Sequence, residues 1–158
     1  MTCSVALDYP TEFPFERKEK DSRFKEYSNI LRERAVDLIL KGCDRFIVSM
    51  TEGAEMDFIK TVLRLKEVYT HVSLEVAVPL EDSKYSFGQN CDCRLEICDE
   101  LFLFCTNPLK KCSMLKRRFM IDNSEYILAF WNGKKSGETW QSIEYACEAG
   151  KNVIVERL

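Results

Sequence analysis

Short apolar runs alternate with longer segments of helical periodicity along the whole chain. Apolar runs suited to buried strands occupy residues 3–7, 45–50, 72–79, 100–105, 126–131 and 152–156. Apolar residues recur at helical spacing in 16–41, 54–69, 110–123 and 140–150, and we expect 110–123 to be only partly helical. Strands that alternate with helices are typical of parallel sheets. The pattern therefore predicts an α/β fold with a mostly parallel sheet of about six strands flanked by helices.

Turn-forming residues separate these segments. Gly42 and Gly150 are placed to end the helices that precede them, and the pair 132–133 (Asn-Gly) follows the fifth apolar run as a turn. The polar and aromatic segment 81–89 predicts a loop that leads into a short helix through Ile97. No repeat, low-complexity segment or linker interrupts the chain, and its 158 residues suit one domain. We therefore expect residues 1–158 to form a single domain.

Composition narrows the protein class. With 46% hydrophobic and 31% charged residues, the chain has the balance of a globular protein rather than of a disordered or membrane-embedded one. Its formal net charge of -3 gives no overall attraction to nucleic acid. The first residues carry neither a basic region nor a long apolar run, so we expect no signal peptide, no membrane association and a cytoplasmic location.

The cysteines favour reduced thiols over a metal site. Eight are spread over the chain, several inside apolar runs where cysteine acts as a small apolar residue. The one tight group is Cys91, Cys93 and Cys98. It contains no C-x-x-C pair, and the only histidine, His71, is distant in sequence. We therefore predict no metal site and expect His71 to lie in a solvated loop.

Candidate chemistry follows the second and fifth predicted strands. The segment 49–57 combines a serine, Gly53 and carboxylates, and the segment 132–139 combines glycines, lysines and hydroxyl groups. In parallel sheets, ligands bind beyond the carboxyl ends of the strands, where helix N-termini favour phosphate groups. Neither segment matches a P-loop or a dinucleotide-binding fingerprint. Each can therefore be a ligand-binding loop or an ordinary turn with a capping residue.

Several motifs in a fixed order resemble a known family. They occupy 46–53 (FIVSMTEG), 78–79 (VP), 117–125 (RRFMIDNSE), 127–133 (ILAFWNG), 136–139 (SGET) and 143–146 (IEYA). In this order they are similar to the YpsA-like family of the SLOG superfamily, which also includes DprA (Smf) and the LOG proteins. The resemblance implies a Rossmann-like three-layer domain that recognises nucleotides or nucleotide-derived small molecules.

The chain departs from this family pattern at two loops. Residues 6–9 (ALDY) replace the usual Thr-Gly-His-Arg, and Glu138 stands where the family has the second glycine of Gly-Gly-Thr. An acidic side chain near a phosphate is unfavourable because like charges repel. Arg117, Arg118, Lys134 and Lys135 are the cations that could offset it.

Other side chains have both a structural and a functional interpretation. Trp131, at the end of a strand, is the better candidate for stacking on a base, whereas Trp140 is expected in the core. Glu55, Asp57 and Glu144 could bind ribose hydroxyls, or could serve as helix N-terminal and solvated helix residues. The basic run 110–118 is expected to be a solvated helix face.

We expect a nucleotide or nucleotide-derived small molecule at the carboxyl edge of the sheet, in a sensor or regulatory domain. The candidate ligand-binding residues are Ser4, Ser49, Thr51, Gly53, Glu55, Arg117, Trp131, Asn132, Gly133, Ser136, Gly137 and Thr139. The alternatives are a LOG-like phosphoribohydrolase, a DprA-like binder of single-stranded DNA through the basic run, and a protein-interaction module without a ligand. No catalytic residue is assigned, no further cofactor is firmly implied, and a homodimer is possible by analogy.

Overall fold

The computed structural model describes residues 1–8, 22–49, 53–79, 98–104 and 111–158. Its elements follow in the order β1 (Thr2–Leu7), α1 (Ser22–Leu40), β2 (Arg45–Ser49), α2 (Ala54–Lys66), β3 (Ser73–Pro79), β4 (Glu100–Phe104), α5 (Lys111–Asp122), β5 (Tyr126–Trp131), α6 (Gly137–Glu148) and β6 (Asn152–Arg157). This alternation confirms the predicted α/β class. The loop and short helix predicted for 81–97 lie outside the described residues.

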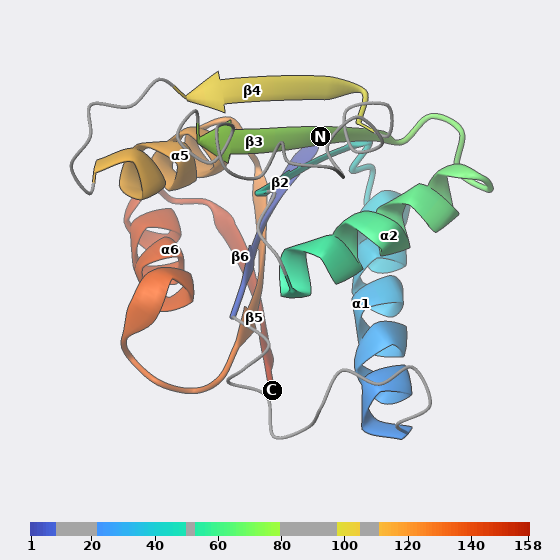
Figure 1. Ribbon diagram of the computed structural model, residues 1–158, viewed down its shortest axis with the longest axis horizontal. Helices are drawn as coiled ribbons and strands as arrows, with labels where there is room; N and C mark the ends of the chain where they lie inside the picture. Colours follow the sequence, from blue (N-terminus) through green and yellow to red (C-terminus); the bar gives the residue numbers. More distant parts are fainter. Residues whose placement is uncertain (9–21, 50–52, 80–97, 105–110) are drawn as a thin grey trace, which may run out of the picture.

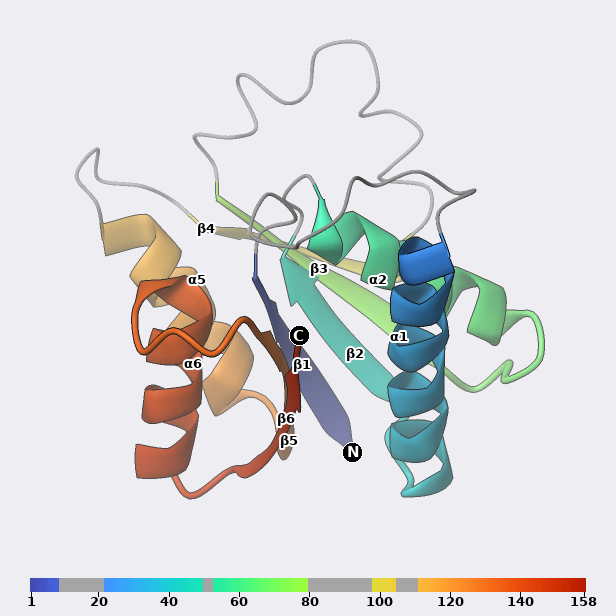
Figure 2. The ribbon, with the colours of Figure 1, turned by 90° about the horizontal axis from the view of Figure 1, so that it is seen from below.

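The strands form one parallel sheet between two layers of helices. Their order is β4-β3-β2-β1-β5-β6, and each neighbouring pair is parallel. Figure 1 shows the sheet turning from β6 to β4, with α1 and α2 on one face and α5 and α6 on the other. The same separation of the helices is visible from below in Figure 2. The Rossmann-like three-layer arrangement is therefore confirmed.

Alternating side chains of the strands supply the two sides of the core. On β1, Cys3, Val5 and Leu7 belong to the large apolar cluster that also contains buried residues of α1 and α2. On the opposite face, Ile47 of β2 packs with Ala77 and with Met120 of α5. Successive side chains of a strand point to opposite faces, and here both faces are covered by helices. This explains why the strands were recognisable as nearly continuous apolar runs.

The ends of two helices differ from the sequence prediction. α6 begins at Gly137 rather than near Trp140, because its first turn is polar and adds nothing to the apolar periodicity. α2 ends at Lys66 rather than at Tyr69. Beyond Lys66 the chain forms a tighter turn, in which the Val68 N–H bonds to the carbonyl of Leu65, three residues earlier. Within the described residues, no helix combines the length and the apolar character needed to cross a membrane.

The strand order creates a topological switch point between β1 and β5. The helices that follow these strands in the chain, α1 and α6, lie on opposite faces of the sheet. The carboxyl ends of β1 and β5 therefore lie side by side, and from them the chain continues to opposite faces of the sheet. Ligands of open parallel sheets bind at this position.

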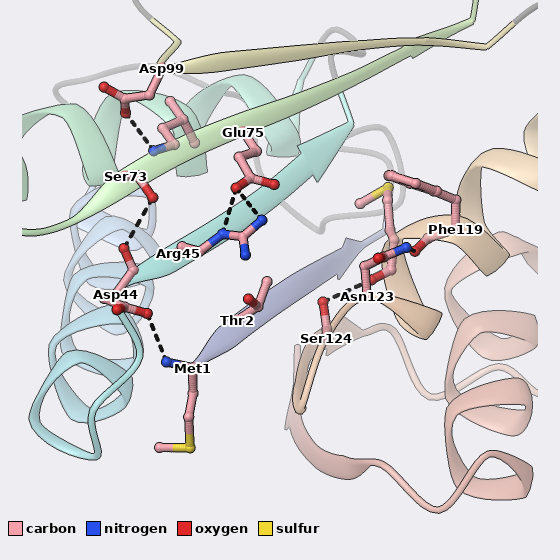
Figure 3. A network of polar contacts seen from close by, with 12 residues as sticks. Met1, Thr2, Asp44, Arg45, Ser73, Glu75, Asp99, Phe119, Asn123 and Ser124 are labelled. Atoms are coloured by element: carbon pink, nitrogen blue, oxygen red, sulfur yellow. Dashed lines mark hydrogen bonds and ion pairs between the residues drawn. The ribbon is translucent and has the colours of Figure 1, made fainter.

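At the opposite edge, where the strands begin, polar side chains bond to side chains and to N–H groups of neighbouring segments (Figure 3). The Arg45 guanidinium at the start of β2 donates to Oε1 of Glu75 on β3 at 2.6 Å. The N–H of Thr2 on β1 donates to Oε2 of Glu125, just before β5, at 2.6 Å. The carboxylate of Asp99 accepts from the Leu74 N–H on β3 at 2.7 Å. We call this side of the sheet the amino edge and the opposite side the carboxyl edge.

Candidate functional site

A small cavity lies at the carboxyl edge. It encloses about 60 Å³, and the end of β1, the end of β2, the first turn of α2 and the facing parts of α5 and α6 line it. Its lining residues are Val5, Ala6, Leu7, Ser49, Glu55, Lys116, Arg117, Met120, Glu138, Thr139 and Ser142. Four of the predicted ligand-binding residues are in this set: Ser49, Glu55, Arg117 and Thr139. We call this the α5–α6 cavity.

Lys116 is a buried cation in the wall of the cavity. It is only 6% exposed, and its ammonium group donates to Ser49 Oγ at 2.7 Å. Burial of a charged group is unfavourable unless hydrogen bonds or opposite charges compensate it. The expectation that the basic run 110–118 is a solvated helix face is therefore wrong at Lys116. A usable signal was present, because Lys116 precedes the buried Met120 by four residues and so shares its helix face.

A carboxylate from another element faces the same cavity. Glu55 lies in the first turn of α2, which starts after Gly53. Gly53 has a φ of 98°, in a region that side chains other than glycine rarely adopt. Gly53 is the N-cap residue of α2, and Glu55 follows it in the first turn, at the cavity wall. The cavity therefore combines cationic and anionic groups.

The first turn of α6 opens onto the cavity through Glu138 and Thr139. Its N-cap residue, Ser136, makes no side-chain capping hydrogen bond, and Gly137 has a φ of 90°. Thr139 is 3% exposed, and its hydroxyl group bonds to no other group in the described part of the chain. Uncapped N–H groups at a helix N-terminus attract anions. This turn therefore offers donors to a ligand in the cavity.

The acidic residue in this turn already has hydrogen-bond partners. Ser113 Oγ on α5 donates to Oε1 of Glu138 at 2.5 Å. Arg117 donates to the Glu138 carbonyl oxygen at 3.1 Å and to Oε1 of Gln141 at 2.9 Å. Arg117 therefore lies where it can offset the negative charge of Glu138. Lys135 does not line the cavity, and its ammonium lies 5.6 Å from the Trp140 ring centroid.

A second group of the predicted residues builds the turn between β5 and α6 and does not line the cavity. Trp131 stacks on Trp140 with ring centroids 5.1 Å apart, and its indole N–H donates to the Lys134 carbonyl at 2.7 Å. Asn132 Oδ1 accepts from the Lys134 N–H at 2.9 Å, and Gly133 has a φ of 88°. Trp140 is half-buried beside Trp131 rather than inside the core. Trp131, Asn132, Gly133 and Ser136 are thus apart from the α5–α6 cavity.

Those of the remaining candidate residues from the sequence analysis that the structure describes lie in different environments outside the cavity lining. Ser4 is 2% exposed in the middle of β1 and does not line the cavity, and Thr51 lies outside the described residues. Asp57 is buried in α2. Glu144 and His71 are exposed, as expected for a solvated helix face and a loop.

Sequence reasoning missed Asp8 at the end of β1. Asp8 is 7% exposed, and its carboxylate accepts a hydrogen bond from the Asn132 N–H after β5. Its own N–H donates to the Phe130 carbonyl at 3.1 Å. It therefore links the two strands at the switch point. Its place within the altered 6–9 segment was the only signal in the sequence.

Four cysteines are described as free thiols. Cys3 and Cys43 are buried, Cys98 is half-buried and Cys147 is exposed. Burial raises the pKa of the Cys3 thiol well above its ordinary value. Cys91, Cys93 and Cys105 lie outside the described residues. Within the part of the chain that the structure describes, no three His, Cys, Asp or Glu side chains are grouped to hold a metal ion.

Comparison with known families identifies the family of the chain. Residues 10–153 match the family described as the YspA SLOG family (YpsA). The match extends from just after β1 into β6 and covers more than half of the chain. Comparison with curated proteins finds no match. The family resemblance inferred from the ordered motifs is confirmed.

Proposed function

The chain belongs to the YpsA SLOG family, and on that premise we propose that it binds a nucleotide or nucleotide-derived small molecule at the carboxyl edge of the sheet, as a sensor or regulatory domain. The observation that carries the proposal is the buried Lys116, which faces the α5–α6 cavity together with the first turn of α6. The ammonium group of Lys116, which donates to Ser49 Oγ, brings positive charge to the wall of the cavity, and positive charge attracts an anionic group of a ligand. We propose that this group is a phosphate.

Two further features support a phosphate. The Thr139 hydroxyl and the N–H groups of the first turn of α6 are hydrogen-bond donors beside the same cavity. Helix N-termini stabilise anions because their N–H groups and the helix dipole carry partial positive charge. Arg117 bonds to oxygen atoms of this turn, which adds positive charge near it. Together these groups oppose the charge of Glu138.

The size of the cavity restricts how a ligand can bind. About 60 Å³ is enclosed, whereas pockets that enclose a whole small molecule have volumes of roughly 300–1,000 Å³. The enclosed part therefore accepts one group of a nucleotide rather than the whole molecule. We propose that Glu55, on the α2 side of the cavity, accepts hydrogen bonds from ribose hydroxyls, as acidic residues do in dinucleotide-binding folds.

A thermal-shift screen tests the proposal. The purified protein would be heated with mono-, di- and cyclic nucleotides, nucleotide sugars, NAD and ADP-ribose, each at a constant ionic strength. A ligand present at about a hundred times its dissociation constant adds roughly 2.7 kcal/mol of stability, which gives a clear rise in Tm. If no compound in this set raises the Tm, the proposal fails, and a ligand-free interaction module becomes the better interpretation.

Gly137 offers a matched pair of variants for the binding site. No atom lies within 4 Å of a Cβ built there, and both Asn and Asp tolerate a positive φ better than other side chains. Gly137→Asp adds a negative charge at the first turn of α6, whereas Gly137→Asn adds nearly the same atoms without the charge. We expect Gly137→Asp to weaken phosphate-dependent binding and Gly137→Asn to retain most of it. Equal affinities for the two variants would place the ligand elsewhere.

The two alternative activities find less support in the side chains. Glu144 is exposed on α6 and does not line the cavity, so it offers no carboxylate for phosphoribohydrolase chemistry there. In the basic run, Lys116 is buried, Arg117 bonds to α6, and the Arg118 guanidinium lies 5.1 Å from the Tyr145 ring centroid. Lys116 and Arg117 are therefore engaged within the protein, which leaves Arg118 as the exposed cation of these three.

A further inference from the structure

A second hollow lies on the other face of the sheet, between α1 and α2. It has a volume of about 310 Å³, which is within the usual range for small-molecule sites. Its lining residues are Phe24, Ser28, Asn29, Arg32, Asp57, Lys60, Thr61, Arg64, Leu65 and Val68. We call it the α1–α2 groove. It is separated from the α5–α6 cavity by the sheet, because the two helix pairs cover opposite faces (Figure 2).

Cations from both helices line this groove and outnumber its acidic lining residue. The side chains of Arg32 on α1 and of Lys60 and Arg64 on α2 make no ion pair or hydrogen bond with any other residue that the structure describes. An adjoining hollow that shares Phe24, Ser28, Asn29 and Arg64 is also lined by Lys25. The acidic lining residue of the groove, Asp57, is 7% exposed. The groove thus has an excess of positive charge.

This lack of partners contrasts with other arginines of the protein. Arg34 pairs with Asp37 and Glu156, and Arg45 pairs with Glu75. Arg117 donates to two oxygen atoms of α6. The chain therefore supplies partners for arginines elsewhere, but not for the two that face the α1–α2 groove. Neighbouring like charges repel, and an anion between them removes this repulsion.

The remaining lining residues suit the uncharged part of a ligand. Phe24 is half-buried, Leu65 is buried and Val68 is 74% exposed, so the groove has apolar contact surface next to its cations. Ser28 and Asn29 add hydrogen-bonding groups on α1. Arg guanidinium groups bind phosphate and carboxylate groups through paired N–H donors.

We propose that the α1–α2 groove is a second binding site, for an anionic small molecule whose phosphate or carboxylate groups bind Arg32, Lys60 and Arg64 and whose apolar part contacts Phe24, Leu65 and Val68. The proposal is independent of the nucleotide site, because the two sites share no lining residue. A regulatory domain with two such sites can respond to two different compounds.

Calorimetric titration at constant ionic strength, with pyrophosphate, phenyl phosphate and citrate as probes, tests this site. Binding of either phosphate but not citrate assigns the groove to phosphoryl ligands, and the reverse assigns it to carboxylates. Either result supports the site if Arg64→Gln and Arg32→Gln each weaken binding about tenfold, a change typical of losing one charged contact. The control is Lys41→Gln, which removes one exposed charge outside the groove and should leave the affinity unchanged.

Amide chemical shifts separate this site from the nucleotide site. During the same titration, we expect the N–H signals of Ser28, Asn29 and Thr61 to move, and those of the first turn of α6 to stay. Thr139→Val should leave probe binding unchanged even where it abolishes nucleotide binding. The proposal is overturned if none of the probes binds, if Lys41→Gln weakens binding as much as Arg64→Gln does, or if the shifts cluster at α6 instead.

Discussion

The amino edge and the carboxyl edge of the sheet use polar residues in different ways. At the amino edge, side chains bond to groups of neighbouring strands: Arg45 to Glu75, Glu125 to the Thr2 N–H, and Asp99 to the Leu74 N–H. At the carboxyl edge, the Thr139 hydroxyl makes no hydrogen bond with a described residue, and the first turn of α6 has no side-chain cap.

We infer from this difference that the amino edge contributes mainly to the stability of the fold and the carboxyl edge mainly to ligand binding. The hydrogen bonds at the amino edge join groups of neighbouring strands, so they stabilise the fold. Polar groups at the carboxyl edge surround a cavity, so their remaining hydrogen-bonding capacity is available to a bound molecule. Substitutions at the two edges should therefore affect different measurements, and the following predictions test this in order of expected effect.

The largest effect is expected for Lys116→Met. Removing the buried ammonium should weaken binding of the nucleotide selected in the thermal-shift screen roughly a hundredfold, or about 2.7 kcal/mol, because a charged contact with the ligand is lost. Calorimetric titration measures the change. Arg118→Met is the matched control, since it removes a neighbouring but exposed charge and should change the affinity little. Similar losses in both variants would argue against a specific role for Lys116.

The next largest effect is expected on the free energy of unfolding, for Glu75→Ala at the amino edge. Glu75 is 3% exposed and accepts hydrogen bonds from Arg45, so its truncation should lower the free energy of unfolding by about 1.5 kcal/mol. Glu75→Gln keeps the shape and an acceptor, and should lose less. Urea denaturation measures both. Nucleotide affinity should not change, and a loss of affinity would contradict the separation of the two edges.

A smaller and opposite effect is expected for Ser4→Ala. Ser4 Oγ is buried and has no hydrogen-bond partner among the described residues, so its removal should raise the free energy of unfolding by about 0.5–1 kcal/mol. Nucleotide binding should be unaffected because Ser4 does not line the cavity. Weaker binding in Ser4→Ala would restore Ser4 to the ligand site that the sequence suggested.

The smallest effect is expected on the pH dependence of stability, through Asp99. Burial raises the pKa of the Asp99 carboxyl, but hydrogen bonds from Lys66 and the Leu74 N–H outweigh this and hold the pKa below its ordinary value. A carboxyl with a lowered folded-state pKa stabilises the protein above its unfolded-state pKa of about 3.9 and loses this contribution as the pH falls through the folded-state pKa. We therefore expect wild-type stability to decline from about pH 5 to pH 3 more steeply than that of Asp99→Asn. Parallel curves would show that Asp99 contributes nothing to acid sensitivity.

Part of the candidate site could be predicted from the sequence, because strand ends and helix starts are local features. Ser49, Glu55 and Thr139 were placed after strands or in first helical turns, and all three line the α5–α6 cavity. The loop 132–136 was equally prominent in the sequence, but its residues build the turn between β5 and α6. Motif residues cannot be divided between ligand contact and turn formation without knowing which way each side chain points.

The sequence by itself determined the succession of strands and helices along the chain, the parallel arrangement of the strands, and the family to which the chain belongs. These follow from periodicity along the chain and from the order of motifs, both of which are local or one-dimensional properties. Only the tertiary structure decided that Lys116 is buried against Ser49, that Arg117 bonds to the Glu138 carbonyl oxygen, and that Arg32 and Arg64 face one groove. The physical reason is that burial, charge pairing and cavity shape depend on contacts between elements that are distant in sequence.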